Sequence, residues 1–244
     1  MDKRGKLGII GGMGSRAGAM LFAKVLDYSP ALKDQDFMEV LLHSNSKIPD
    51  RTRHIVNDEE SPVKELLRSI KLLNESKVDY IIMACLTAHY FYDTLQRHSK
   101  AKIIHLMKST KEHIQTFYPR IQTIGLLATT GTLQSRIFHK EFENTGIELV
   151  TLDEEDNERI FMQSVYMEGG LKSATVSSEA LSLFHQSIPK LMNQGAQAII
   201  GGCTEVQIAI KKTTVEVPYI DPMDIAAIEA VKLCYKKDLQ AVNL

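Results

Sequence analysis

The chain has 244 residues, which is enough for one large domain or for two smaller domains with their own cores. The formal net charge of −1 and the pI near 6.7 give no reason to expect nucleic acid or an anionic membrane as a partner. No apolar run approaches the roughly 18 residues of a transmembrane helix, and the first residues do not have the pattern of a signal peptide. The three cysteines lack CxxC spacing, which argues against disulfides or structural zinc and favours the cytoplasm.

Short β-branched runs alternate with longer segments of helical period, a pattern typical of an α/β protein with mostly parallel sheets. The predicted strands are Leu7–Ile10, Glu39–His43, Tyr80–Met83, Ile103–His105, Thr123–Leu127, Glu148–Thr151, Ala198–Ile200 and Tyr219–Ile220. The predicted helices include Ala17–Tyr28, Ser61–Ser76 and Ser177–Asn193. Ser61 followed by Pro62 fits an N-cap with proline in the first helical position.

The two halves of the chain share a pattern. The segment KLGIIGGMGS (residues 6–15) resembles TIGLLATTGT (residues 123–132), and each contains a strand followed by a turn of small residues. Gly125 follows Gly8 by 117 residues, and Cys203 follows Cys85 by 118. These similar offsets favour a duplicated α/β unit over a chance likeness of short apolar strands. In a duplicated fold both cysteines would face one cleft, since ligands bind beyond the carboxyl ends of parallel strands.

Glycines follow the first predicted strand, at Gly11, Gly12 and Gly14. A dinucleotide site with this loop needs an acidic residue at the end of the second strand, and that strand ends LLHSNS. The sequence therefore argues against a nucleotide site. Two interpretations of the glycines remain: a helix N-terminus whose amides bind a substrate carboxylate, or a tight turn.

Cysteines in proteins are commonly buried and inert, and we expect this of Cys234, which lies within a helical pattern. Cys85 and Cys203 instead lie at strand ends among small or hydroxylated residues. A thiol with a pKa of about 8.5 needs only modest positive charge nearby to form a thiolate. Two facing thiols can remove a proton from one side of a carbon and deliver one to the other side, which inverts a stereocentre. A single nucleophilic cysteine would explain one strand end but not both.

Several motifs, in the same order along the chain, carry a further signal. They are LGIIGGMGSRAG (7–18), NSKIPDRT (45–52), ACLTAHYFY (84–92), GLLATTGT (125–132), GGCTEV (201–206) and IDPMDI (220–225). Together they resemble, nearly end to end, the motifs of the cofactor-independent aspartate/glutamate racemase superfamily, in particular its aspartate racemase branch. The resemblance implies racemisation of an acidic amino acid, aspartate or glutamate, without cofactor or metal, in a homodimer.

The resemblance also implies roles for individual residues. Cys85 and Cys203 would be the acid/base thiols, and Arg51 would pair with the substrate's side-chain carboxylate, for which a guanidinium is well shaped. The other implied substrate-binding residues are Met13, Gly14, Thr87, Thr129, Lys172 and Thr204. From the residues alone, Arg51 would instead be a surface arginine. Glu205 would orient Cys203 or a backbone amide, or cap a helix, and His89 would either tune the Cys85 thiol or simply pack.

The fold implied is a pair of similar parallel-sheet sub-domains with helices on both faces and the active site in the cleft between them. We expect residues 1–108 and 216–244 to form the sub-domain that carries Cys85, and residues 109–215 to form the one that carries Cys203.

The sequence departs from the family motifs at two places. Leu86 stands where the family has an asparagine beside the first cysteine, and Ser15-Arg16 replaces a Pro-Glu pair. An apolar Leu86 cannot make the hydrogen bonds of an amide. The alternatives are therefore a related racemase or isomerase with another substrate, a lyase that uses one cysteine as nucleophile, or a catalytically weak amino-acid-binding protein.

Overall fold

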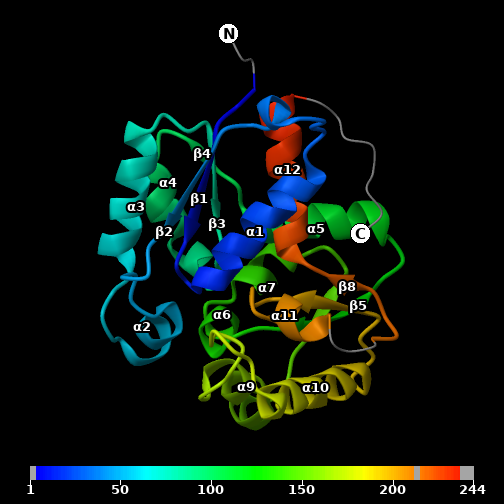
Figure 1. Cartoon of the computed structure of the whole chain (residues 1–244). Coiled ribbons are helices and arrows are strands. Elements are labelled where there is room, and N and C mark those ends of the chain that lie inside the picture. The colour runs from blue at the N-terminus through cyan, green and yellow to red at the C-terminus, as the bar shows by residue number, and fades with distance from the viewer. Residues whose placement is uncertain (1–3, 212–214, 237–244) are drawn as a thin grey trace.

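The computed structural model describes residues 4–211 and 215–236 and shows two parallel sheets with helices around them (Figure 1). The first sheet consists of β1 (Leu7–Gly11), β2 (Val40–Ser44), β3 (Tyr80–Met83) and β4 (Lys102–Ile103). The second consists of β5 (Thr123–Leu127), β6 (Glu148–Val150), β7 (Ala198–Gly201) and β8 (Tyr219–Ile220). The predicted fold class, α/β with two similar parallel sheets, is confirmed.

The two sheets have the same topology. The strand order is β2-β1-β3-β4 in the first sheet and β6-β5-β7-β8 in the second, and every pair is parallel. Each strand of the first half therefore has an equivalent in the second, with β1 matching β5 and β3 matching β7. This correspondence agrees with the duplication that the two sequence offsets predict.

The predicted strands are all present, with small shifts at their ends. The largest shift is in β4, which ends at Ile103 instead of continuing to His105. His105 begins the next helix as its N-cap, because its ring accepts a hydrogen bond from the Lys108 amide at 3.2 Å. The pairing with β3 ends at Ile103, so His105 is extended but lies outside the strand.

Helices cover both faces of each sheet. The α-helices are α1 (Ser15–Tyr28), α2 (Arg51–Asn57), α3 (Val63–Glu75), α4 (Tyr92–His98), α5 (Leu106–Phe117), α6 (Thr130–Gln134), α7 (Ile137–Phe142), α8 (Glu154–Asp156), α9 (Gln163–Tyr166), α10 (Ser178–Met192), α11 (Val206–Ile210) and α12 (Pro222–Tyr235). Short 3-10 helices lie at η1 (Asp34–Asp36) and η2 (Thr87–Phe91), and a π-helix, η3 (Asn157–Met162), joins α8 to α9. Among the described residues, none of these helices has the length and apolar character needed to cross a bilayer.

The predicted helices Ser177–Asn193 and Ser61–Ser76 form as α10 and α3, with one difference at a cap. Ser177 caps α10 by accepting a hydrogen bond from the Ala180 amide at 3.1 Å. Ser61 accepts only a long contact from the Val63 amide at 3.4 Å, and α3 starts after Pro62, whose backbone is already helical. The predicted cap at Ser61 is therefore displaced by one residue.

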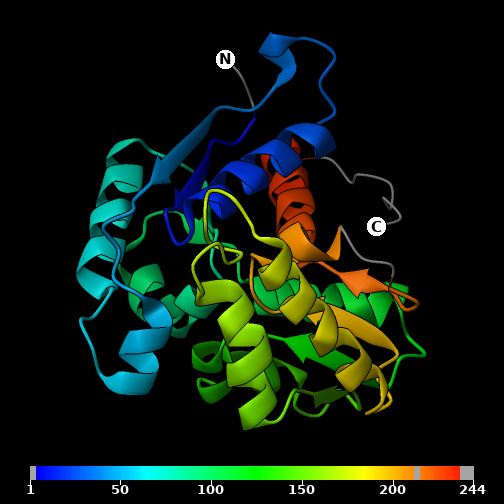
Figure 2. The same ribbon diagram turned by 60° about the horizontal axis from the view of Figure 1, so that its bottom comes forward.

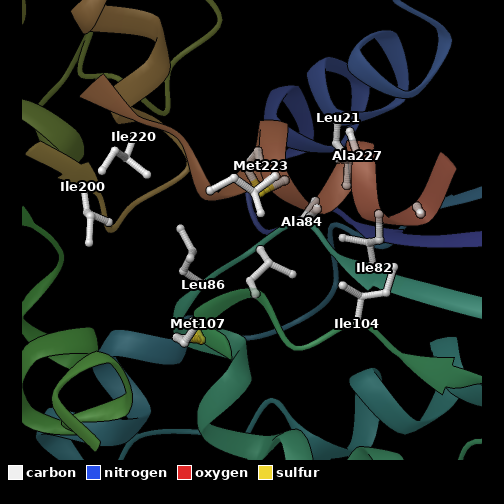
Figure 3. Packing of buried hydrophobic residues seen from close by; sticks show 14 of the residues in the cluster. Leu21, Ile82, Ala84, Leu86, Ile104, Met107, Ile200, Ile220, Met223 and Ala227 are labelled. Atoms are coloured by element: carbon white, nitrogen blue, oxygen red, sulfur yellow. The ribbon is translucent and has the colours of Figure 1, made fainter. Parts of the chain in front are cut away.

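One apolar core joins the two halves (Figure 3). It contains Ile82 and Ile104 of the first half together with Ile200 and Ile220 of the second, and Met223 of α12 lies among them. Two further clusters lie on the outer faces, one under α3 and α4 and the other under α10 and α11. The shared core holds the carboxyl ends of the two sheets in a fixed relation.

The chain returns to the first half through α12, but later than expected. The expected boundary at residue 216 is wrong for β8, because Tyr219 and Ile220 pair with Ile199 and Ile200 of β7. Of the described residues after 215, it is α12 that packs on the first half, against α1 and α5, as Figure 1 shows for the red helix. The reason is that β8 is the equivalent of β4 and completes the second sheet.

Two glycines allow close approaches near the carboxyl ends of the strands. Gly12 has a φ of +91°, and a Cβ there would lie 2.2 Å from the carbonyl carbon of Asn45. At Gly131, at the start of α6, a Cβ would lie 2.8 Å from the Cα of Thr52 on α2. No other residue fits either position without moving the backbone. These contacts place Met13 and α2 at the junction of the two halves.

Candidate active site

A small cavity lies between the halves, at the carboxyl ends of the strands. It is lined by Met13, Arg51, Thr52, Cys85, Leu86 and Thr87 from the first half and by Thr129, Tyr166, Lys172, Cys203, Thr204 and Glu205 from the second. The free space inside is about 10 Å³, roughly what one water molecule needs. The structure thus brings the predicted site residues together, with Gly14 as the exception. Gly14 is the N-cap of α1, and a Cβ on it would lie 3.0 Å from Glu205 Oε1.

Cys85 and Cys203 occupy equivalent positions, after β3 and after β7. Both are nearly buried, with 5% and 6% of their surfaces exposed. The residues that follow differ, since Cys85 is followed by Leu86 and Thr87, and Cys203 by Thr204 and Glu205. Equivalent backbone positions therefore hold two thiols in unlike chemical surroundings.

Cys203 lies against a buried ion pair. Its Sγ donates a hydrogen bond to Glu205 Oε2 at 3.0 Å, and Thr204 Oγ1 donates to the same oxygen at 3.0 Å. Lys172 Nζ lies 3.4 Å from the other carboxylate oxygen. Burial and the Glu205 charge raise the pKa of Cys203 well above its usual value, against the opposing effect of Lys172. Cys203 is therefore a protonated thiol at neutral pH.

Glu205 is ionised in this arrangement. Burial acts to raise its pKa, but Lys172 and the hydrogen bonds from Cys203 and Thr204 outweigh burial and lower it. Burial likewise acts to lower the pKa of Lys172, while Glu205 and Cys203 raise it above the usual range. The pair thus stays charged although it is buried.

Arg51 lies on the Cys85 side of the cavity and is 6% exposed, so it is not a surface arginine. Its Nη2 donates to the carbonyl of Met13 and its Nη1 to that of Pro49, each at 2.9 Å. Its Nε is buried without a hydrogen-bond partner. Burial acts to lower the pKa of Arg51, and Cys85 and Asp50 raise it. A permanent positive charge therefore lies beside the Cys85 thiol, on a guanidinium that does not use all of its donors.

Threonine hydroxyls from both halves meet at one side of the cavity. Thr52 donates to Thr129 at 3.3 Å, and Thr87 lies 3.2 Å from Thr129 and 2.8 Å from Thr132. The Thr129 and Thr132 oxygens are 3.1 Å apart. These hydroxyls hold one another in place, and one that gives up such a bond can donate its proton to an oxygen in the cavity.

His89 stabilises the turn that carries Cys85. Its Nδ1 lies 3.1 Å from the carbonyl oxygen of Cys85 and 3.2 Å from that of Leu86, and its Nε2 lies 3.5 Å from the Leu106 amide. Nε2 also lies 3.5 Å from the Ile104 carbonyl, but the Nδ1 contacts with carbonyls are shorter, and carbonyls only accept, so the geometry favours the proton on Nδ1 and Nε2 as acceptor. Burial, and next His105, lower its pKa to about 4. His89 is therefore neutral at pH 7 and fixes the Cys85 backbone.

Thr52 and Tyr166 line the cavity but were not predicted. Thr52 directly follows Arg51 in the IPDRT segment, so a complete use of that motif would have included it. Tyr166 lies far from both cysteines in the sequence and belongs to no motif, so no local signal marks it. Leu86 and Glu205 were noted in the sequence and are now placed on the cavity wall. Within residues 4–211 and 215–236, no group of histidine, cysteine and acidic side chains has the arrangement of a metal site.

Residues 10–230 match the sequence profile of a family described as Asp/Glu/Hydantoin racemase. The chain belongs to this family. Its membership confirms the expected superfamily and the expected enzyme class, an amino-acid racemase and hence an isomerase.

Individual members of the family are similar along almost their whole length. The broad specificity amino-acid racemase RacX of Bacillus subtilis is 26% identical over 220 residues, which cover 88% of this chain and 92% of RacX. An aspartate racemase from Picrophilus torridus is 27% identical with a TM-score of 0.82, covering 97% of this chain and 96% of its own. A glutamate racemase from Francisella tularensis, solved with D-glutamate, has the same fold at 18% identity, with a TM-score of 0.67 over 97% and 81% of the two chains.

Proposed function

We propose that this racemase inverts the α-carbon of an acidic amino acid, aspartate in particular, by proton transfer between Cys85 and Cys203. The observation that carries the proposal is the placement of both thiols on one cavity, from equivalent positions of two like sheets. A substrate whose α-carbon lies between them has one thiol on each face. Inversion needs a base on one face and an acid on the other, which two such thiols supply.

The two thiols have different neighbours. Cys85 lies beside the Arg51 guanidinium, and Cys203, which donates to the Glu205 carboxylate, is held as the thiol. In one direction Cys85 takes the α-proton while Cys203 delivers its own proton to the opposite face. The products are the other enantiomer, a protonated Cys85 and a Cys203 thiolate. The reverse reaction starts from this second form, and Lys172 then balances the added negative charge beside Glu205.

The cavity can bind two carboxylates. The buried Arg51 Nε is available to the side-chain carboxylate, and Lys172 supplies the second cation. The hydroxyls of Thr87 and Thr129 lie on the same cavity, and either can turn its proton from the other threonines to the α-carboxylate, on which negative charge grows when the α-proton leaves. Aspartate is the substrate best matched to these groups, and the similarity to the Picrophilus torridus aspartate racemase supports this choice.

One observation favours a second candidate. Leu86 lines the cavity and is 1% exposed, so one wall beside Cys85 is apolar. A substrate with an apolar side chain would lose no hydrogen bond there, and RacX, a broad specificity racemase, is among the relatives. The second candidate is therefore racemisation of non-acidic amino acids at the same two thiols.

The proposal includes a homodimer in the cytoplasm that works without cofactor, as the resemblance to the superfamily implies. Size-exclusion chromatography with light scattering on the full chain tests the dimer. A single species with the mass of one chain, at concentrations where the protein is active, would contradict it.

The test of the reaction is exchange of the α-hydrogen in heavy water, followed by proton NMR together with the change in optical rotation. The unchanged protein should exchange the α-hydrogen of D- and L-aspartate and convert each into the other. Cys85→Ala and Cys203→Ala should each abolish interconversion, since either face is then left without its proton carrier.

The matched control is Cys234→Ala. Cys234 is buried within α12, and burial raises its pKa to about 12, so it is an inert thiol. This variant should retain its racemase activity. Near-normal interconversion by Cys203→Ala would sink the two-thiol mechanism, and binding of aspartate without exchange by the unchanged protein would indicate a binding protein.

A further inference from the structure

A second, larger space lies next to the catalytic cavity. It is a hollow of about 580 Å³ on the protein surface, and its walls include Asp50, Thr130, Gln134 and Glu158. The hollow and the cavity share two lining residues, Thr52 and Tyr166. Tyr166 also borders a third hollow of about 410 Å³ beside Asp50 and Arg53. The side chain of Tyr166 therefore stands where the cavity meets the outside.

The two shared residues are held differently. Thr52 is 8% exposed and lies on α2, and its hydroxyl bonds to Thr129 of the other half. Tyr166 is 39% exposed and is the last residue of α9, after which the chain turns into an extended conformation at Met167. Its hydroxyl donates to Asp50 Oδ2 at 3.1 Å, and the Lys172 ammonium lies 5.4 Å from the centre of its ring. Thr52 is thus buried between the halves, whereas Tyr166 is partly exposed at the end of its helix.

The segment that follows Tyr166 extends across the molecule. In Figure 2 the yellow-green connection from α9 to α10 reaches toward α1, and Arg16 of α1 donates to the carbonyl of Ala174 in this connection. Lys172, in the same connection, reaches Glu205 in the cavity. Tyr166 thus begins the stretch of chain that closes the cavity on the side of the second half.

The free space in the cavity is too small for a substrate. About 10 Å³ admits a water molecule but no amino acid, so side chains must move when a substrate enters. Arg51, Thr87 and Cys203 are buried and tied into the core. Tyr166 also borders the 580 Å³ hollow, so its displacement into that space makes room in the cavity without moving the buried side chains.

We propose that Tyr166 is a specificity-determining residue, a wall between the catalytic cavity and the outer hollow that limits the length of the side chain racemised. The inference rests on the proposed racemase function and names a feature of its substrate range. A short acidic side chain ends at Arg51 and Lys172, inside the wall. Each further methylene pushes the distal carboxylate against the Tyr166 ring, and removal of the ring joins the cavity to the hollow.

The experiment uses three diacids that differ by one methylene each: aspartate, glutamate and 2-aminoadipate. The efficiency kcat/KM for α-hydrogen exchange in heavy water is measured for the unchanged protein, Tyr166→Leu and Tyr166→Ala. One methylene in a fitted pocket changes kcat/KM by about 10-fold or more. We expect Tyr166→Ala to raise the ratio of glutamate to aspartate efficiency by about that factor, with a further rise for 2-aminoadipate.

Two controls separate the wall from other effects. Tyr166→Phe keeps the ring and loses only the bond to Asp50, so its ratio should stay that of the unchanged protein. Tyr90→Ala truncates another exposed tyrosine, 51% exposed and outside the cavity lining, and should also leave the ratio unchanged. Circular dichroism and thermal unfolding establish that each variant is folded, and Tyr166→Leu serves if Tyr166→Ala is not.

The outcomes are distinct. If the unchanged protein exchanges none of the amino acids, the proposed function fails. If it exchanges aspartate and a folded Tyr166→Ala or Tyr166→Leu keeps the same preference, the function stands and the assignment of Tyr166 is overturned. A changed ratio in Tyr166→Phe equal to that in Tyr166→Ala would assign the effect to the bond with Asp50 instead of the wall.

Discussion

Glu205 accepts a hydrogen bond from Cys203 Sγ at 3.0 Å, so Glu205→Gln removes a negative charge in contact with the thiol. The glutamine side chain has nearly the same shape, and its amide can accept from the thiol or donate to the thiolate. Gly14, against which Glu205 packs, leaves no room for a larger group. The substitution therefore changes charge with little change in packing.

The size of the effect follows from the contact. Two unit charges about 4 Å apart interact by about 4 kcal/mol at an effective dielectric constant of 20, which corresponds to about 3 pKa units. Glu205 raises the pKa of Cys203, and Lys172 acts in the opposite direction and remains after the substitution. We therefore expect the pKa of Cys203 to fall in Glu205→Gln.

The assay is a direct titration of Cys203 by the ultraviolet absorbance of its thiolate. The background is Cys85→Ala with Cys234→Ala, so that Cys203 is the one remaining cysteine. Glu179→Gln on the exposed first turn of α10 is the matched control and should leave the midpoint unchanged. Activity should also fall in the otherwise unchanged Glu205→Gln protein, since a more acidic Cys203 is a weaker base.

One result of the Cys203 titration would contradict this prediction. A midpoint for Cys203 that stays the same or moves upward in Glu205→Gln would show that the carboxylate does not hold the thiol protonated. The assignment of Cys203 as the resting thiol would then have to be given up, although both thiols could still act as acid and base.

Three further predictions concern other parts of the molecule. Arg51→Ala should raise the KM for aspartate steeply, by the roughly 1.5–3 kcal/mol of a charged hydrogen bond, and affect alanine little; equal losses measured for both substrates would make Arg51 structural. Leu86→Asn should raise kcat/KM for aspartate about tenfold while lowering stability in denaturant, since Leu86 packs in the shared core; no gain with aspartate and a loss with apolar amino acids would favour the second candidate. Lys24→Met should lower the free energy of unfolding by about 3 kcal/mol, because Lys24 Nζ lies 2.6 Å from Asp224 and 3.2 Å from the buried Asp221. The control is Lys71→Met on the exposed side of α3, and equal unfolding midpoints for the two variants would refute this prediction.

The parts of the fold that could be predicted from the sequence are those with a local pattern. The central strands β1, β3, β5 and β7 are short apolar runs that end in small residues, so both their type and their equivalence are visible in the sequence. The position of β8 depends on pairing with β7, a contact that no local pattern shows, and the expected boundary at residue 216 therefore failed for it.

Some residues of the candidate site could likewise be predicted from the sequence, and others could not. Cys85, Cys203 and the threonines could be predicted because each belongs to a motif at a strand end. Which hydroxyls meet, and that Glu205 accepts from Cys203, follows only from the packing of the two halves. Tyr166 could not be predicted, since its position depends on where the chain leaves α9 and on a hydrogen bond to Asp50 of the other half.

The return of α12 to the first half has a consequence for biosynthesis. Leu7, Ile9 and Ile82 of the first sheet share a core with Ala227 and Val231 of α12, although about 120 residues of chain separate β4 from that helix. At a synthesis rate of 5–20 residues per second, α12 is therefore synthesised roughly 6–24 seconds after β4. Throughout that interval the residues that α12 covers lack this partner. Burial of this part of the Cys85 half thus comes only when α12 has left the ribosomal tunnel.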